Sequence, residues 1–193
     1  MQHIKKVVVI GPESTGKSTL CKLLAQHFNT LWCEEYAREY LLEHGTNYTA
    51  AELLTIAKGQ LALEDTYTKE AASLHIKSPS SSPVLFVDTD MYVMKVWSEY
   101  VFGVCDFYIL DELVKRDYDL YLLCNIDLPW VKDELREYPD EQPRIELFHI
   151  YKDILINQNT PWVLISGNYE ERLSNAIKAV EGVLEYKYEA NNN

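Results

Sequence analysis

The sequence predicts an α/β fold, a five-stranded parallel sheet with helices on both faces. Two observations carry this prediction. Short apolar runs, typical of strands buried on both sides, recur along the 193 residues, and segments with apolar residues at helical spacing separate them. This alternation is typical of parallel strands joined by crossover helices. The length suits one domain, expected over residues 1–187, with a small lid and a disordered tail at 188–193.

The elements follow from local signals. Thr49 and Glu52 form a capping-box pattern that opens a long helix, Gly45 stops the helix before it, and Gly103 predicts a break in a later one. The expected strands lie at 5–10, within 30–36, and at 84–88, 120–127 and 162–168. The expected helices lie at 17–28, 37–45, 49–75, 90–116, 145–158 and 170–187.

Charge and hydropathy narrow the function classes. The net charge of −12 would repel a nucleic-acid backbone, so we expect no nucleic-acid partner, although a local nest of N–H groups can still bind a small anion. No apolar run is long enough to span a bilayer, and the N-terminus lacks the apolar block of a signal peptide. These features predict a cytoplasmic protein with no membrane partner.

The cysteines favour a reducing compartment. Cys21, Cys33, Cys105 and Cys124 show no C-x-x-C spacing, and each sits among apolar or aromatic residues. Buried free thiols are therefore expected rather than a metal site.

The stretch GPESTGKST, residues 11–19, fits G-x-x-x-x-G-K-[ST] and lies between an expected strand and an expected helix. Glycines let backbone N–H groups turn towards phosphate, and the following helix directs its positive end at it. Lys17 would reach the β- and γ-phosphates, and the Ser18 hydroxyl would bind Mg²⁺. This context disfavours a plain glycine turn. The predicted nucleotide contacts are Gly11, Glu13, Ser14, Thr15, Gly16, Lys17, Ser18 and Thr19.

A phosphate-binding loop does not by itself separate a kinase from a GTPase, an ATPase motor or a regulator. The N-K-x-D sequence that recognises guanine is absent, and CNIDLPW follows the fourth expected strand. ATP, or a permissive donor site, is therefore favoured over GTP.

Carboxylates follow two of the expected strands, and ligands of such sheets lie beyond the carboxyl ends of the strands. Asp88 ends an apolar strand, where a carboxylate can hold Mg²⁺ directly or through water. Asp90 would hold a substrate hydroxyl or share the metal, and Glu35 would accept a proton from a substrate alcohol. Either Glu35 or Asp90 is thus a possible base, and the competing interpretation for all three is a helix cap or a solvated turn charge.

Beyond the phosphate loop, the chain resembles the ribosylnicotinamide (nicotinamide riboside) kinase domain of trifunctional NAD-biosynthesis regulators. The matching stretches run in order over about residues 4–183. They are GPESTGKSTL, EEYAREYL, KGQLALED, FVDTDMYVMKVWSEYVFG, DLYLLCNIDLPWVKDELR and ISGNYEERLSNAI. The resemblance implies a P-loop kinase-like three-layer sandwich with a mobile lid. It also implies transfer of the ATP γ-phosphoryl group to the ribose 5′-hydroxyl of nicotinamide riboside.

The resemblance also implies roles for residues. It places Glu35, Tyr36, Arg38 and Glu39 at the substrate side, and Asp88 and Asp90 at the metal and ribose. Trp97 looks like an aromatic face for the nicotinamide ring, a flat cation. A core position on its helix is the alternative for Trp97.

The expected lid, at about residues 131–146, contains Arg136 and Arg144 in a polar segment with two prolines. A basic residue that closes over ATP would neutralise transition-state charge and exclude water. We assign this catalytic and ATP-binding role to Arg136. Arg144 is expected to be a further contact to ATP. The competing interpretation is surface arginines paired with neighbouring acids. The resemblance brings Trp130 and Asp133 towards this lid, and packing is the alternative for Trp130.

The sequence departs from the family at the lid, where DELR, with Glu134, replaces D-G-L-R. The chain also has no room for the regulators' DNA-binding and adenylyltransferase domains, so those functions are not expected. The leading hypothesis is a kinase for nicotinamide riboside. The alternatives are a kinase for another nucleoside or nucleotide, and a regulatory ATPase whose nucleotide orders a loop for a partner. The sequence leaves a homo-oligomer open.

Overall fold

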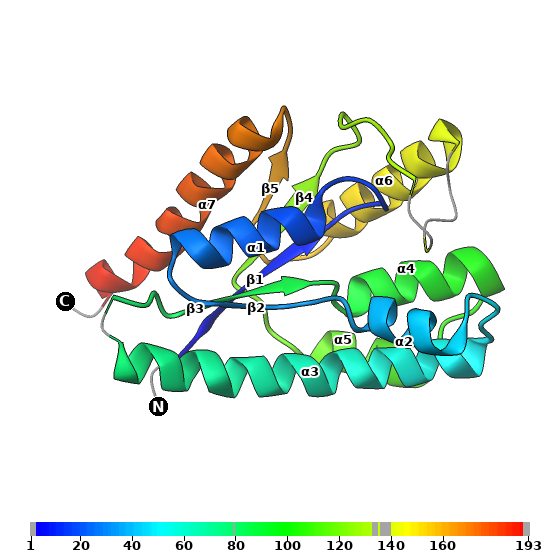
Figure 1. The fold of residues 1–193 in the computed structure, drawn as a ribbon, viewed down its shortest axis with the longest axis horizontal. Helices are drawn as coiled ribbons and strands as arrows, with labels where there is room; N and C mark the ends of the chain where they lie inside the picture. The colour runs from blue at the N-terminus through cyan, green and yellow to red at the C-terminus, as the bar shows by residue number, and fades with distance from the viewer. Residues whose placement is uncertain (1–2, 79, 133–134, 136–139, 191–193) are drawn as a thin grey trace.

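The computed structural model describes residues 3–78, 80–132, 135 and 140–190, and it confirms the α/β prediction (Figure 1). Its five-stranded sheet is parallel throughout, with the order β2-β3-β1-β4-β5. The strands are β1 (Lys5–Ile10), β2 (Leu31–Cys33), β3 (Val84–Asp88), β4 (Leu120–Cys124) and β5 (Trp162–Ile165). Val9 pairs with Asp88 on one side and with Leu122 on the other, so the central strand fixes where its neighbours end.

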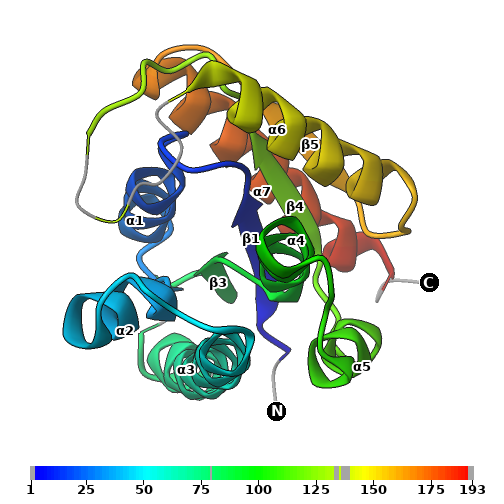
Figure 2. The same cartoon turned by 90° about the vertical axis from the view of Figure 1, so that its right-hand side faces the viewer.

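Helices cover both faces of this sheet, which gives three layers (Figure 2). The helices α1 and α7 pack on one face, and α3, α4 and α6 pack on the other. The helices are α1 (Lys17–His27), α2 (Tyr36–His44), α3 (Ala50–Lys77), α4 (Met91–Phe102), α5 (Phe107–Lys115), α6 (Glu141–Ile156) and α7 (Tyr169–Ala190).

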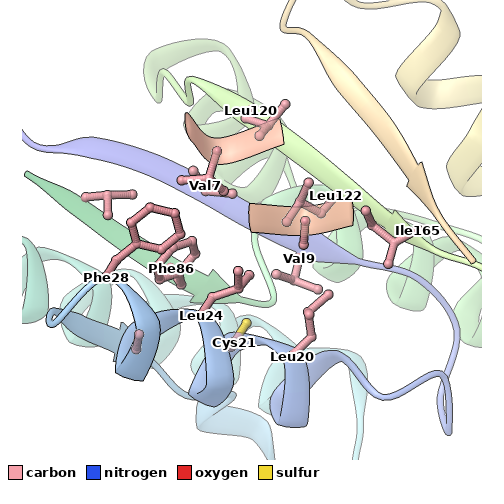
Figure 3. Close-up of a cluster of buried hydrophobic side chains, with 14 of the residues drawn as sticks. Val7, Val9, Leu20, Cys21, Leu24, Phe28, Phe86, Leu120, Leu122 and Ile165 are labelled. Atoms are coloured by element: carbon pink, nitrogen blue, oxygen red, sulfur yellow. The ribbon is translucent and has the colours of Figure 1, made fainter. Parts of the chain in front are cut away.

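Side chains of β1 alternate between two hydrophobic cores. Val7 and Val9 belong to the core between the sheet and α1, with Leu20 and Leu24 of that helix (Figure 3). Val8 belongs to the opposite core with residues of α6. Burial on both faces is why the strand has a continuous apolar run rather than an alternating pattern.

The local stop and start signals predicted from the sequence are confirmed. Thr49 and Glu52 form a reciprocal capping box, in which the Thr49 N–H donates to Glu52 Oε2 at 2.7 Å. The helix predicted over 90–116 is divided, because Gly103 ends α4 with a left-handed φ of 71° and Asp106 caps α5.

Two helix ends differ from the prediction. The helix α6 begins at Glu141, inside the expected lid, rather than at residue 145. Pro143 lies in its first turn, where the missing N–H would have no intrahelical partner. At the other end of the chain, α7 continues to Ala190, past the expected end at 187.

The thiols of Cys21, Cys33 and Cys124 are buried and free, as expected, and Cys105 is free and half-buried. In the described part of the chain, no helix combines the length and the apolar character needed to cross a membrane.

Candidate active site

A cavity of about 710 Å³ lies at the carboxyl ends of the strands. The loop after β1, the segment after β2 and the last residue of β3 meet there, and α2, α4 and α6 close the wall. The lining residues are 11–19, Trp32, Glu34, Glu35, Ala37, Arg38, Glu39, Leu41, Leu42, Asp88, Val93, Trp97, Tyr100, Leu135, Leu147 and Tyr151. All of the predicted donor contacts within residues 11–19 therefore face one hollow.

The loop at residues 11–19 has the backbone of a phosphate nest. Ser14 and Gly16 have φ values of 58° and 81°, left-handed conformations that turn successive N–H groups to one side. The Thr15 hydroxyl donates to the Pro12 carbonyl at 2.7 Å, and Lys17 Nζ donates to the same oxygen at 3.0 Å. The helix α1 begins at Lys17 without a side-chain cap, so its first N–H groups remain available to an anion.

Arg172 of α7 binds the backbone of this loop without lining the cavity, and the sequence did not predict this contact. Its side chain is 3% exposed and donates to the carbonyl oxygens of Thr15, Asn125 and Gly167, at 2.9, 2.9 and 2.8 Å. It also pairs with the Asp127 carboxylate. One guanidinium thus ties the nest to the ends of β4 and β5.

The segment after β4 contacts the outer side of the nest. The Trp130 indole N–H donates to Glu13 Oε1 at 3.1 Å, and the Val131 N–H donates to Ser14 Oγ at 3.0 Å. The structure therefore places Trp130 beside the donor loop. It does not line the cavity.

Asp88 is a buried carboxylate whose oxygens lack hydrogen-bond partners in the described part of the chain. Its side chain is fully buried, and neither carboxylate oxygen has a hydrogen bond of ordinary geometry among the described residues. Burial, followed by the negative charge of Glu35, raises the pKa of Asp88 to about 6, although Lys17 and the nearby Ser18 hydroxyl act in the opposite direction. Two orphaned oxygens beside Ser18 and the nest suit a bound cation.

This burial predicts a pH-dependent stability. Because the pKa of Asp88 is higher in the folded chain than its ordinary 3.8, ligand-free stability should fall as pH rises from about 4 through about 6. Asp88→Asn should remove that cost and stabilise the ligand-free protein at pH 7.5 by on the order of 2–3 kcal/mol. Urea unfolding of both proteins at pH 4 and pH 7.5 measures it, and an equal difference at both values would contradict the explanation.

Asp90 is also fully buried, but its oxygens are engaged. Oδ1 accepts the N–H groups of Tyr92 and Val93 and caps α4, and Oδ2 accepts the Tyr121 hydroxyl at 2.8 Å. Burial raises the pKa of Asp90 to about 6 despite these bonds. Asp90 does not line the cavity, whereas Glu35 does. In the structure Asp90 is the N-cap residue of α4.

Trp97 both lines the cavity and packs against a hydrophobic core, and its role as a stacking face stays a prediction. Its ring lines the cavity from α4, and its indole N–H donates to the Tyr48 hydroxyl at 2.7 Å. The two rings meet edge to face, with centroids 4.9 Å apart. The hydrogen bond fixes the orientation of the indole that the cavity presents.

The other predicted site residues differ in whether they line the cavity. Arg38 lines the cavity from α2. Tyr36 does not, because its ring packs on Gly59 of α3. Arg144 lies in α6 with a 5% exposed side chain, 3.4 Å from the Leu128 carbonyl oxygen, and it does not line the cavity either. Arg136, Asp133 and Glu134 fall outside the described residues. Direct roles for Tyr36, Asp90, Trp130, Arg136 and Arg144 stay predictions.

Much of the apolar wall of the cavity was not foreseen. Trp32 comes from β2, Tyr100 from α4, Leu147 and Tyr151 from α6, and Leu41 and Leu42 from α2. Each is an ordinary apolar position within its own element, so only the packing of α2, α4 and α6 around the strand ends reveals it.

Together, the nest between β1 and α1, the isolated Asp88 and the 2-3-1-4-5 parallel sheet define a P-loop protein with a nucleoside or nucleotide kinase-like fold. A comparison with protein families identifies the family of the chain. A family model described as an AAA domain matches residues 6–172, and the chain belongs to that family.

The curated relatives are trifunctional NAD biosynthesis/regulator proteins named NadR, to which the chain is homologous. It is 27% identical over 186 residues to the protein from Escherichia coli (strain K12), and 26% identical over 183 residues to that from Salmonella typhimurium. The matches cover 94% of this chain but 43% of each relative. The chain thus spans less than half the length of these relatives.

Solved structures support the same fold. A NadR protein in complex with NAD and AMP-PNP gives a TM-score of 0.65 at 25% identity, covering 94% of this chain and 50% of that one. NadR in complex with NR gives 0.67 at 22% identity, covering 94% and 51%. Thymidylate kinase from Ehrlichia chaffeensis gives 0.64 at 16% identity, covering 93% and 99%. The last two show the fold alone.

Proposed function

We propose that the chain transfers the γ-phosphoryl group of ATP to the ribose 5′-hydroxyl of nicotinamide riboside, giving nicotinamide mononucleotide. One observation carries the proposal: a single cavity is lined both by the phosphate nest and by aromatic rings with carboxylates. Homology to NadR, and the NR and AMP-PNP named for its solved complexes, support the same acceptor and donor.

The donor side suits ATP with Mg²⁺. The nest and the N-terminus of α1 would hold the phosphates, with Lys17 at the β- and γ-phosphates. Ser18 and Asp88 would hold the ion, which would supply positive charge next to the phosphates. No group of three or more His, Cys, Asp or Glu side chains in the described ranges could hold a metal alone. Mg²⁺ typically binds through one or two protein carboxylates, substrate phosphates and water.

The acceptor side suits a flat cation. Its wall carries the rings of Trp32, Trp97, Tyr100 and Tyr151, and the carboxylates of Glu34, Glu35 and Glu39. A pyridinium ring stacks favourably on aromatic faces, and acidic neighbours stabilise its charge. An uncharged base would gain the stacking but not the electrostatic attraction.

Glu35 is the group that would accept the proton. It lines the cavity, as Asp88 does, and its negative charge raises the pKa of Asp88, which supports a place near the proposed metal and phosphoryl positions. The 5′-oxygen would attack the γ-phosphorus, the bond to the β-phosphate oxygen would break, and the hydroxyl proton would pass to Glu35 while ADP leaves. Charge stabilisation by Lys17 and the ion contributes more than the base in such a loose transition state.

The test is acceptor-dependent ADP release. Purified protein with Mg²⁺ and ATP is incubated with nicotinamide riboside, thymidine, adenosine, cytidine or thymidylate, and ADP and the phosphorylated product are quantified. The proposal predicts the highest kcat/KM for nicotinamide riboside. A higher value with another acceptor would assign the site to that nucleoside or nucleotide, and slow ADP release that no acceptor stimulates would favour a regulatory ATPase.

Trp97 provides a specific prediction for the acceptor side. Trp97→Ala removes the stacking face, so KM for nicotinamide riboside should rise about 10-fold or more while KM for ATP stays nearly unchanged. Tyr48→Phe is the matched control, because it removes the hydrogen bond to the indole but keeps both aromatic rings, and it should raise KM far less. Equal changes in both KM values would indicate a role in core packing instead.

A further inference from the structure

Glu35 occupies an unusual place for a chemically active carboxylate, because it is the N-cap residue of α2. Short side chains such as Ser or Asp usually fill this position and accept the first free N–H groups of the helix. Glu35 makes no such capping bond. Its carboxylate remains available to the cavity, and another group has to satisfy the start of the helix.

Gln60 of α3 supplies that group. Its side chain is fully buried, and its Oε1 accepts the N–H of Tyr36, the first residue of α2, at 2.8 Å. Its Nε2 donates to the carbonyl oxygen of Glu34 at 3.2 Å and approaches Cys33 Sγ at 3.5 Å. One amide therefore holds the residues immediately before and after Glu35.

The residue before Gln60 completes the contact. A Cβ at Gly59 would lie 2.1 Å from Cε1 of the Tyr36 ring, so only glycine lets the ring lie against α3. Figures 1 and 2 show α2 running beside α3, which extends over 28 residues. Gly59 and Gln60 thus attach residues 34–36 to α3. Gly59 contacts the Tyr36 ring, and Gln60 binds the backbone of Glu34 and Tyr36.

We infer that Gln60 is a positioning residue that fixes the backbone on both sides of Glu35 and so directs its carboxylate at the reacting hydroxyl. This inference rests on the proposed function for the role of Glu35, but the contact itself does not. A buried amide suits the task because it accepts on one side and donates on the other without adding charge beside Glu34 and Glu35.

The experiment replaces Gln60 with Met, which has similar volume but can neither accept nor donate these hydrogen bonds. We expect kcat to fall about 10- to 100-fold with KM for ATP nearly unchanged, since the donor loop is not involved. Leu61→Ala is the matched control. It disturbs a neighbouring buried position of α3 and should lower Tm with kcat changed less than about twofold.

A double mutant separates positioning from general destabilisation. If Gln60 acts through Glu35, Glu35→Gln combined with Gln60→Met should be no slower than Glu35→Gln alone. Additive losses would overturn the inference. If Gln60→Met does not fold, Gln60→Asn, which stays uncharged but is one methylene too short to hold both Tyr36 and Glu34, replaces it in the same cycle.

Hydrogen exchange tests the contact without any substrate. The Tyr36 amide should exchange at least about tenfold faster in Gln60→Met than in the wild type, relative to the Ile56 amide, and Leu61→Ala should not change this ratio. An unchanged ratio would overturn the inference, whichever acceptor the enzyme uses. A faster Tyr36 exchange in a protein that no acceptor stimulates would instead overturn the proposed function and leave the contact standing.

Discussion

Lys17→Ala is expected to reduce kcat for phosphoryl transfer by at least about 10²- to 10³-fold, the usual cost of losing one preorganised transition-state donor. Lys17 lies at the start of α1 and lines the cavity, with its ammonium held over the nest by the Pro12 carbonyl oxygen at 3.0 Å. No other lysine lines the cavity among the described residues. Charge that builds up on the phosphoryl group would therefore lose its principal side-chain cation.

The control for this variant is Lys22→Ala, which removes an exposed lysine from the same helix. It should leave kcat within about twofold of the wild type, because a solvated charge on the outer face contributes little. Both variants should unfold within a few degrees of the wild type, measured by circular dichroism. A Lys17→Ala enzyme that keeps half of its activity would mean that residues 11–19 do not form the donor site.

The sequence predicted the parts of the site that depend on neighbouring residues. The nest needs a strand, glycines and a helix start within residues 5–19, and Asp88 ends an unbroken apolar run. Asp90 is a less simple case. It lies two residues beyond β3, at the N-cap position of α4, where its carboxylate accepts backbone N–H groups, and the sequence pattern at the strand end does not show this second task.

The sequence could not predict contacts that join distant segments. Gln60 holds Tyr36 across 24 residues, and Arg172 holds Thr15 across 157. Both side chains lie on helices whose apolar positions are regular, and neither local pattern shows which partner is near. The aromatic wall has the same origin, since Trp32, Tyr100 and Tyr151 meet only when α4 and α6 pack around the strand ends.

Arg172→Met is expected to be the most destabilising single change in the site. The substitution keeps part of the apolar stem but removes the donor to three carbonyl oxygens and leaves Asp127 without its cation. Removing a buried donor leaves its acceptors unsatisfied at about 1–3 kcal/mol for each group, so urea unfolding should show a fall of about 3–5 kcal/mol, to which the exposed Asp127 adds little. Lys178→Met removes an exposed charge from the same helix and should change stability by no more than about 0.5 kcal/mol.

The same variant tests whether Arg172 serves the donor loop. Because its guanidinium fixes the Thr15 carbonyl, Arg172→Met should weaken ATP binding even at a temperature where the variant is folded. KM for ATP should rise about 10-fold, while KM for the acceptor changes little, since Arg172 is not among the residues of the cavity wall. If stability falls but both KM values stay at the wild-type level, the residue serves only to join α7 to the sheet, and the nest keeps its shape without it.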